Sequence, residues 1–163
     1  MVIMGIDPGT ATTGFGVVEK NGNNVKYVTC GVIATPKTAE MQDRLLTIYT
    51  QLNRLLDTHS PEVIATERLF FGNNVSTALL VGRTVGVVML AAAQRGLQWV
   101  EYRPVEVKMA VVGYGAAEKA QVQFMVKQLL RLDKVPRPDD AADALAIAVC
   151  HAHSAHITGL SKP

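Results

Sequence analysis

The sequence has few cysteines and no long apolar run. Its 163 residues include two cysteines, Cys30 and Cys150. They fall in a predicted strand and a predicted helix, so no disulfide framework is indicated and a reducing, cytoplasmic setting is expected. Although 48% of the residues are hydrophobic, no stretch reaches the ~20 apolar residues that a membrane-spanning helix needs. The N-terminal residues also lack the basic region and cleavage site of a signal peptide, so no membrane partner is expected.

The sequence also lacks a large net charge. Its net charge of +2 is too small to indicate a nucleic-acid partner by itself. Residues 1–60 carry five basic and five acidic side chains, whereas residues 61–163 carry eleven and nine. Two divalent cations bound to the four acids discussed below would raise this balance by four, from +2 to +6. A polyanion would meet such a surface favourably only when the metal is bound.

The order of predicted elements indicates one layered α/β domain. No repeat, low-complexity tract or linker interrupts the chain, so we expect a single domain over residues 1–156 and a flexible tail at 157–163. Three strands that can form an antiparallel meander, joined by a turn at residues 21–23, come before alternating helices and strands. The predicted strands are 2–7, 12–20, 25–35, 62–67 and 97–102, and the predicted helices are 39–58, 75–95, 104–112, 118–132 and 139–155.

Two acidic residues end predicted buried strands. Asp7 ends the first strand in the sequence GIDPGT, and Glu67 ends the strand VIATE. A carboxylate at the end of a buried strand is costly to desolvate unless a cation or several donors meet it. The alternatives are a turn acceptor for Asp7 and an exposed strand end paired with Arg68 for Glu67. Open α/β sheets usually place their sites at such strand ends.

Two further acids open the last predicted helix. Asp140 and Asp143 are three residues apart and therefore share a helix face. Acidic residues also favour helix starts as caps and dipole partners, which is the simpler explanation for this pair and for Asp139. The alanines that surround the pair would let this helix approach the sheet closely and deliver its acids to the strand ends.

The four acids together predict a centre for divalent cations. Oxygen ligands with no cysteine or histidine at ligand spacing suit Mg²⁺ or Mn²⁺ rather than zinc. Two such ions ~3.5–4 Å apart can activate a water and stabilise the leaving oxygen in phosphodiester hydrolysis. Another cluster, Cys150, His151, His153 and His156, superficially resembles a zinc site, but on one helix these side chains point in different directions.

Four stretches in this order resemble the RuvC family of bacterial Holliday-junction endonucleases, and the resemblance covers nearly the whole chain. They are GIDPG at residues 5–9, IATE at 64–67 with Phe70 soon after, VVGYGAAEK at 111–119 and DDAADALA at 139–146.

The resemblance implies an RNase H-like fold, with a five-stranded mixed sheet of three antiparallel and two parallel strands flanked by helices. It implies a homodimer that binds four-way DNA junctions in recombination and repair and nicks two strands of like polarity symmetrically. Asp7, Glu67, Asp140 and Asp143 would be the catalytic acids and the ligands of two Mg²⁺ ions per subunit, with Mn²⁺ able to substitute. A branch-migration complex of the RuvA and RuvB type is a further implied partner.

DNA contacts are predicted partly from the resemblance. Lys119 lies near a helix start, where the helix dipole disfavours a cation, and the resemblance makes it a contact to DNA or to the transition state. Lys108 resembles the family's other DNA-contacting lysine. Phe70 would stack on an unpaired base at the junction. Each lysine alone also fits a solvated surface charge.

Three arginines, Arg68, Arg83 and Arg103, would complete a phosphate-contacting surface with Lys108. Relatives commonly carry QARG where this chain has RTVG at residues 83–86, and Arg83 would substitute for their arginine on the same helix. This helix, 75–95, is apolar on most faces, which predicts burial in a core or at a dimer interface. In the family it is the interface.

Two other functions are compatible with parts of the pattern. A catalytically silent junction-binding module would share the DNA contacts, although it would have no need of four clustered acids. An actin-like nucleotide-binding protein could use the DPGT sequence at residues 7–10 as a phosphate loop. That class needs a second phosphate loop and a second subdomain, for which the chain is too short.

Overall fold

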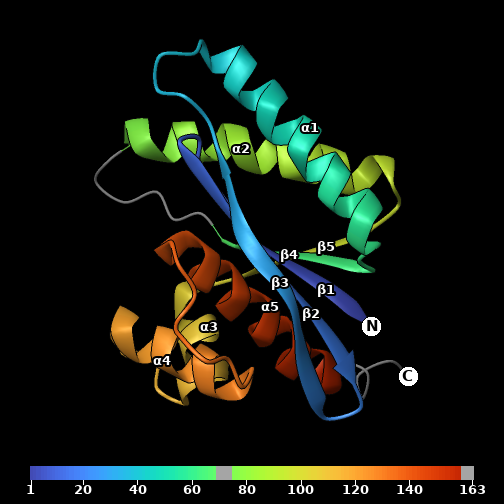
Figure 1. Ribbon diagram of the computed structural model, residues 1–163, viewed down its shortest axis with the longest axis vertical. Coiled ribbons are helices and arrows are strands. Elements are labelled where there is room, and N and C mark those ends of the chain that lie inside the picture. The colour runs from blue at the N-terminus through green and yellow to red at the C-terminus, as the bar shows by residue number, and fades with distance from the viewer. Residues whose placement is uncertain (69–74, 159–163) are drawn as a thin grey trace.

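The computed structural model describes residues 1–68 and 75–158, with side chains described for residues 1–68 and 78–155. All ten predicted elements are present, in the predicted order (Figure 1). The strands are β1 (Val2–Asp7), β2 (Thr12–Asn21), β3 (Asn24–Ala34), β4 (Val63–Glu67) and β5 (Gln98–Tyr102). The helices are α1 (Met41–His59), α2 (Val75–Gln94), α3 (Pro104–Val112), α4 (Lys119–Leu129) and α5 (Asp139–Thr158).

The five strands form one mixed sheet in the order β3-β2-β1-β4-β5. β1 pairs antiparallel with β2, and β2 with β3, so the first three strands make the predicted meander. β4 then pairs parallel with β1 on one side and with β5 on the other. The predicted mixed α/β sheet is confirmed. Because β1 and β4 are parallel neighbours, their C-terminal ends meet at the same edge of the sheet.

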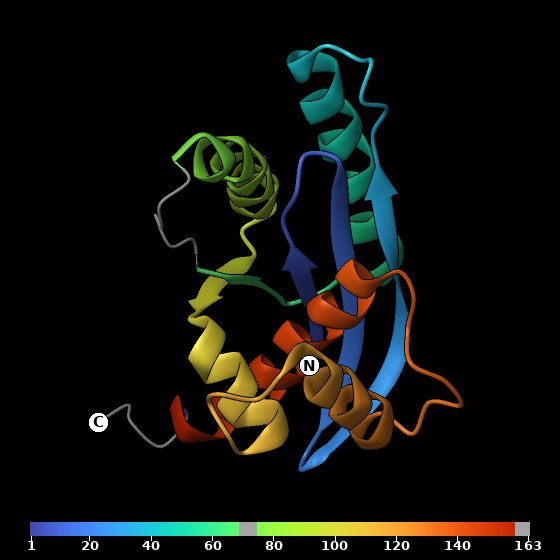
Figure 2. The same ribbon diagram turned by 90° about the vertical axis from the view of Figure 1, so that its left-hand side faces the viewer.

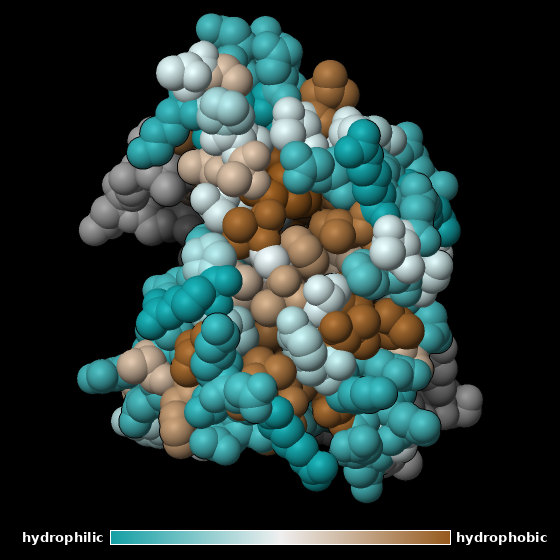
Figure 3. Space-filling model, viewed as in Figure 1, coloured by the Kyte–Doolittle hydropathy of each residue, from teal (hydrophilic) through white to brown (hydrophobic). Residues whose placement is uncertain are grey.

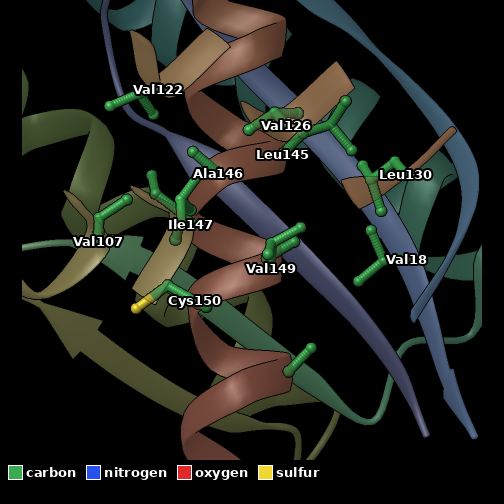
Figure 4. Packing of buried hydrophobic residues seen from close by; sticks show 14 of the residues in the cluster. Val18, Val107, Val122, Val126, Leu130, Leu145, Ala146, Ile147, Val149 and Cys150 are labelled. Atoms are coloured by element: carbon green, nitrogen blue, oxygen red, sulfur yellow. The ribbon is translucent and has the colours of Figure 1, made fainter. Parts of the chain in front are cut away.

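Helices cover both faces of the sheet. The α1 and α2 helices pack on one face and α3, α4 and α5 on the other (Figures 1 and 2). Successive side chains of β1 alternate between the two cores, as the pleat requires: Ile3 belongs to the core with α5, and Met4 belongs to the core with α1 and α2. Figure 4 shows the first core, in which α5 lies between β2 and the helices α3 and α4.

The α5 helix packs directly against the sheet through residues that lack large side chains. A Cβ atom added at Gly5 of β1 would collide with the carbonyl oxygen of Ala144, and one added at Gly14 of β2 would collide with that of Asp140. Ala141 and Ala144 on the helix side are completely buried. The alanines were expected to allow a close approach, and the structure shows that glycines in two neighbouring strands are equally necessary.

Two predicted helices differ in detail from the structure. The helix predicted at 118–132 ends earlier, at Leu129, because the backbone turns to a positive φ of 53° at Arg131. The α2 helix was expected to be buried in a core or at a dimer interface, and within the single chain it is buried on one face only. One face of α2 is buried in the core, whereas Leu79 and Leu90 on the outer face are 58% and 53% exposed.

The surface mixes polar and apolar residues. In Figure 3 apolar residues gather along the middle of the face shown, between two ends that are covered by hydrophilic residues. Exposed apolar side chains occur on several elements, among them Val28 of β3, Leu46 of α1 and Phe124 of α4. Within the described ranges, no helix combines the length and the apolar character that crossing a membrane requires.

Substitution of Gly5 by alanine is expected to destabilise the fold by about 3 kcal/mol or more, because the new methyl group must displace the backbone of α5. The free energy of unfolding from denaturant titration measures this change. The control is Gln42→Ala in α1, an exposed helical position where the helix propensity of alanine favours folding. Equal stability of the wild type and Gly5→Ala would contradict the close-packing argument.

Candidate metal centre

Two of the predicted acids lie side by side at the edge of the sheet. Asp7 ends β1 and Glu67 ends β4, and the residues that precede them, Ile6 and Thr66, are paired in the parallel register. The two carboxylates therefore emerge from adjacent strands at the same level. The sequence had predicted that both acids end strands, and the sheet order then places them side by side.

The turn after Asp7 does not depend on the Asp7 carboxylate. The hydroxyl of Thr13 donates to the carbonyl of Gly9 at 2.7 Å, and that of Thr35 donates to the carbonyl of Thr10 at 2.5 Å. Among the described residues no donor is hydrogen-bonded to the side chain of Asp7. The alternative role as a turn acceptor therefore has no support, and this half-buried carboxylate is left for another partner.

The other two acids arrive on α5. Asp143 lines one hollow of about 320 Å³ together with Asp7 and Glu67. Asp140, one turn earlier on the helix, lies outside that lining but close enough for its charge to act on Asp7. The structure therefore brings together all four acids that were predicted from the sequence.

Crowding of negative charge shows in the pKa values of the strand acids. Burial raises the pKa of Asp7 from 3.8 to about 7, and the charges of Asp143, Asp140 and Glu67 add to this effect in that order. Burial also raises the pKa of Glu67, again with help from Asp143, while the ammonium group of Lys108 partly opposes the rise. The site holds more negative charge than its protein neighbours neutralise.

Two lysines complete the hollow. Lys108 of α3 and Lys119 of α4 both line it, as their predicted role beside the acids requires. The Nζ atom of Lys119 lies 2.7 Å from Oδ2 of Asp143 and 3.6 Å from Oδ2 of Asp139. The hydrogen bond to Asp143 is the main cause that raises the pKa of Lys119, so this lysine is charged at neutral pH.

The rest of the lining is apolar: Pro104, Val107, Val122 and Ala146. These residues come from α3, α4 and α5 and could not be assigned to the site from the sequence, because their helical spacing indicates only burial. Their contribution is to limit solvent around the acids, which strengthens electrostatic interactions inside the hollow.

The donor set fits a hard divalent cation. It consists of carboxylate oxygens only, which Mg²⁺ and Mn²⁺ prefer, and its raised pKa values indicate uncompensated negative charge. In the described part of the chain, no three acidic, histidine or cysteine side chains lie close enough to hold an ion as they stand. Three of the acids, Asp7, Glu67 and Asp143, line one hollow, and Asp140 lies beside them on α5. His151 and His153 make separate contacts, to the hydroxyl of Tyr102 and to the carbonyl of Ala110.

The predicted arginines do not line the acid hollow. Arg68 and Arg103, which follow β4 and β5, line a separate shallow hollow with Glu101 and Glu106. Arg103 lies 3.0 Å from Glu106 in an ion pair that also caps α3. Arg83 is exposed on α2, and Phe70 lies outside the described residues.

The raised pKa of Asp7 predicts a pH-dependent cost to folding. A carboxyl group with a pKa of about 7 in the folded state and about 3.9 in the unfolded state binds more protons when folded. The free energy of unfolding therefore falls as pH rises from about 4 to 7, and the loss is complete above that range. In EDTA at pH 8, Asp7→Asn should be more stable than the wild type by on the order of 2–3 kcal/mol. This is less than the free energy that corresponds to the full difference between the folded and unfolded pKa values of Asp7.

Denaturant titrations of both proteins in EDTA at pH 4 and pH 8 measure this difference. At pH 4 the difference should shrink to about 0.5 kcal/mol, because the carboxyl group is then protonated in the folded state and about half protonated in the unfolded state. A wild type that is the more stable protein at pH 8 would contradict the crowding of charge around Asp7.

Comparison with known proteins identifies the family of this chain. The family described as crossover junction endodeoxyribonuclease RuvC matches residues 3–151. The chain is 51% identical over 162 residues to the crossover junction endodeoxyribonuclease RuvC of Alkaliphilus oremlandii, with 99% of each chain covered. It is 53% identical over 154 residues to the protein of the same name from Heliobacterium modesticaldum, with 94% of this chain and 95% of the relative covered.

Solved structures show the same similarity. Thermus thermophilus RuvC superposes with a TM-score of 0.90 at 36% identity, with 97% of each chain covered. The same protein in complex with a Holliday junction substrate gives a TM-score of 0.91 at 36% identity, with 97% of this chain and 96% of that chain covered. The five-stranded sheet and its helices are thus an RNase H-like fold, and the chain belongs to the RuvC family of crossover junction endodeoxyribonucleases.

Proposed function

We propose that Asp7, Glu67, Asp140 and Asp143 are the catalytic, metal-binding acids with which this chain cleaves four-way DNA junctions. The chain is a metal-dependent endonuclease that resolves Holliday junctions, as its family membership shows. The observation that carries the assignment is the convergence of Asp7, Glu67 and Asp143 on one hollow, with Asp140 one turn away on α5 and a pKa of about 7 at Asp7. A structural role would not require four clustered acids, of which Lys119 pairs with Asp143, at the edge of a sheet.

The metal is proposed to be Mg²⁺, two ions per subunit, with Mn²⁺ able to substitute. Bound there, the ions would supply an activated water and stabilise the leaving oxygen. The residues of the chain bind and orient: the strand acids are fixed by the sheet and the helix acids by the packing of α5 on Gly5 and Gly14. The apolar wall of Val107 and Val122 restricts water to the open side of the hollow.

The lysines are proposed to meet the DNA. Lys108 and Lys119 line the same hollow as the acids, so a phosphate held there would lie beside both ammonium groups. Lys119 is the one proposed to contact the transition state. The arginines Arg68 and Arg103, which lie next to each other beyond the ends of β4 and β5, are proposed to contact phosphates further along the same strand. Contacts by Arg83 and Phe70 stay predictions from the sequence.

Replacement of Asp7 by asparagine should reduce cleavage of a synthetic four-way junction to background in Mg²⁺, because a ligand of the proposed centre is lost. Junction binding, measured by gel shift in EDTA, should survive. Asp57→Asn is the matched control, because Asp57 is an exposed acid of α1 that pairs with Arg95 far from the hollow. Cleavage by Asp7→Asn at a near-normal rate would overturn the assigned mechanism, and a wild type that binds without nicking in either metal would indicate a catalytically silent module.

The active form is proposed to be a homodimer joined through α2. The outer face of α2 presents Leu79, Met89 and Leu90 to solvent, with Gly86 on the same side. An exposed apolar face with a small residue at its centre is typical of a helix that packs closely on another helix. Two sites related by a two-fold axis would explain paired nicks in a junction that has two-fold symmetry.

Leu90→Glu is expected to give a folded monomer, because an ionised carboxylate in the proposed interface would be desolvated without a partner. Light scattering after gel filtration measures the mass, and circular dichroism checks the fold. Leu46→Glu on α1, an equally exposed leucine at 62%, should leave the oligomeric state unchanged. A Leu90→Glu protein that remains dimeric at micromolar concentration would exclude this face as the interface.

Two further proposals rest on family membership alone. They are a cytoplasmic location, where four-way junctions of bacterial DNA arise, and cooperation with a branch-migration complex of the RuvA and RuvB type.

A further inference from the structure

Asp139 lies beside the four proposed acids without belonging to them, and its two carboxylate oxygens have different partners. Oδ1 accepts a hydrogen bond from Nη1 of Arg137 at 2.5 Å. Oδ2 faces the ammonium group of Lys119 at 3.6 Å. The same ammonium group lies 2.7 Å from Asp143, so Lys119 is held between a proposed metal ligand and an acid outside the ligand set.

These two acids would respond differently to a bound cation. A carboxylate that ligates a divalent cation has much of its charge offset, so Asp143 would attract Lys119 less, and the cation itself would repel the ammonium group. Asp139 would keep its full charge. A second acid is therefore needed if Lys119 is to stay at the hollow while DNA and metal are bound there.

The position of Asp139 suits this task because it is held from two directions. Its backbone is the first residue of α5, the helix that packs against the sheet, and its side chain is held by Arg137 in the connection between α4 and α5. Lys119 comes from the first turn of α4. The pair therefore links the starts of two helices across the mouth of the hollow.

We propose that Asp139 is a positioning residue, which holds the Lys119 ammonium group at the mouth of the acid hollow while Arg137 holds Asp139 in turn. This inference rests on the proposed function of the four acids and of Lys119. It assigns a role in the reaction to a residue that otherwise serves only to begin a helix.

The expected effect is moderate and depends on salt. The side chains of Lys119, Asp139 and Arg137 are 55%, 43% and 72% exposed, so their attractions are screened by solvent and by dissolved ions. Loss of Asp139 should slow cleavage about three- to tenfold at low ionic strength and by less than about twofold near 0.5 M salt, where the Debye length is only a few ångströms.

The test is a double-mutant cycle on a synthetic four-way junction, with the wild type, Asp139→Asn, Lys119→Ala and the double variant. Single-turnover cleavage in Mg²⁺ gives the rate, junction affinity is measured in EDTA, and Mn²⁺ affinity is measured by calorimetry. Asp139→Asn should slow cleavage in the wild-type background and have almost no effect in the Lys119→Ala background. Junction affinity and Mn²⁺ affinity should change by less than about threefold, and Asp139→Glu should restore most of the rate.

Asp133→Asn is the matched control, since Asp133 is an exposed acid of the same connection and lines a different hollow. Equal slowing by Asp139→Asn in both backgrounds would overturn the inference, because the residue would then act independently of Lys119. The inference would also be overturned if Asp139→Asn cleaved at the normal rate while Lys119→Ala cleaved slowly. That result would leave the proposed function intact. A normal rate for Lys119→Ala would remove the proposed role of Lys119 itself, and the inference with it.

Discussion

The contact between the backbone of α5 and the backbones of β1 and β2 is the constraint on which the rest of the structure depends. It exists because Gly5 and Gly14 have no side chains where the helix crosses them and because the facing helix residues are alanines. A helix on a sheet of larger residues would stand several ångströms further away, and its acids would not reach the strand ends. The same small residues therefore determine the packing of α5 and the position of the proposed catalytic acids.

The electrostatics of the site follow from that geometry. Two acids belong to the sheet and two to the helix, so the repulsion between them is opposed by the close packing of α5 and by the ion pair of Lys119 with Asp143. The lysines of α3 and α4 offset only part of the charge, and the other lining residues, Pro104, Val107, Val122 and Ala146, are apolar and offset none of it. Burial and this repulsion together raise the pKa of Asp7 to about 7. Divalent cations bound at the proposed centre would offset the repulsion, so metal binding would also stabilise the fold.

Much of the fold and of the acid site was predictable from the sequence, because it depends on local residue patterns. The apolar runs and the turn at residues 21–23 predicted the strands, the meander and the strand-end positions of Asp7 and Glu67, and the pairing of β1 with β4 in the structure then placed these two acids side by side. Spacing put Asp140 and Asp143 on one helix face. Periodicity describes a residue within its own element and says little about its neighbours in other elements. The role of Gly5, the two partners of Asp139 and the exposed outer face of α2 depend on distances between elements, so they became visible only in the structure.

The crowded acids also affect how long the protein lasts in a cell. A cation that binds the folded chain and not the unfolded one lowers the fraction of molecules that are open at any moment. Proteases act on that open fraction when opening is fast relative to cleavage. The divalent-cation concentration around the enzyme would thus influence its abundance as well as its activity, and molecules unable to hold the ion would be removed selectively. In this way the charge repulsion at Asp7 would act as a quality check on the population of active enzyme.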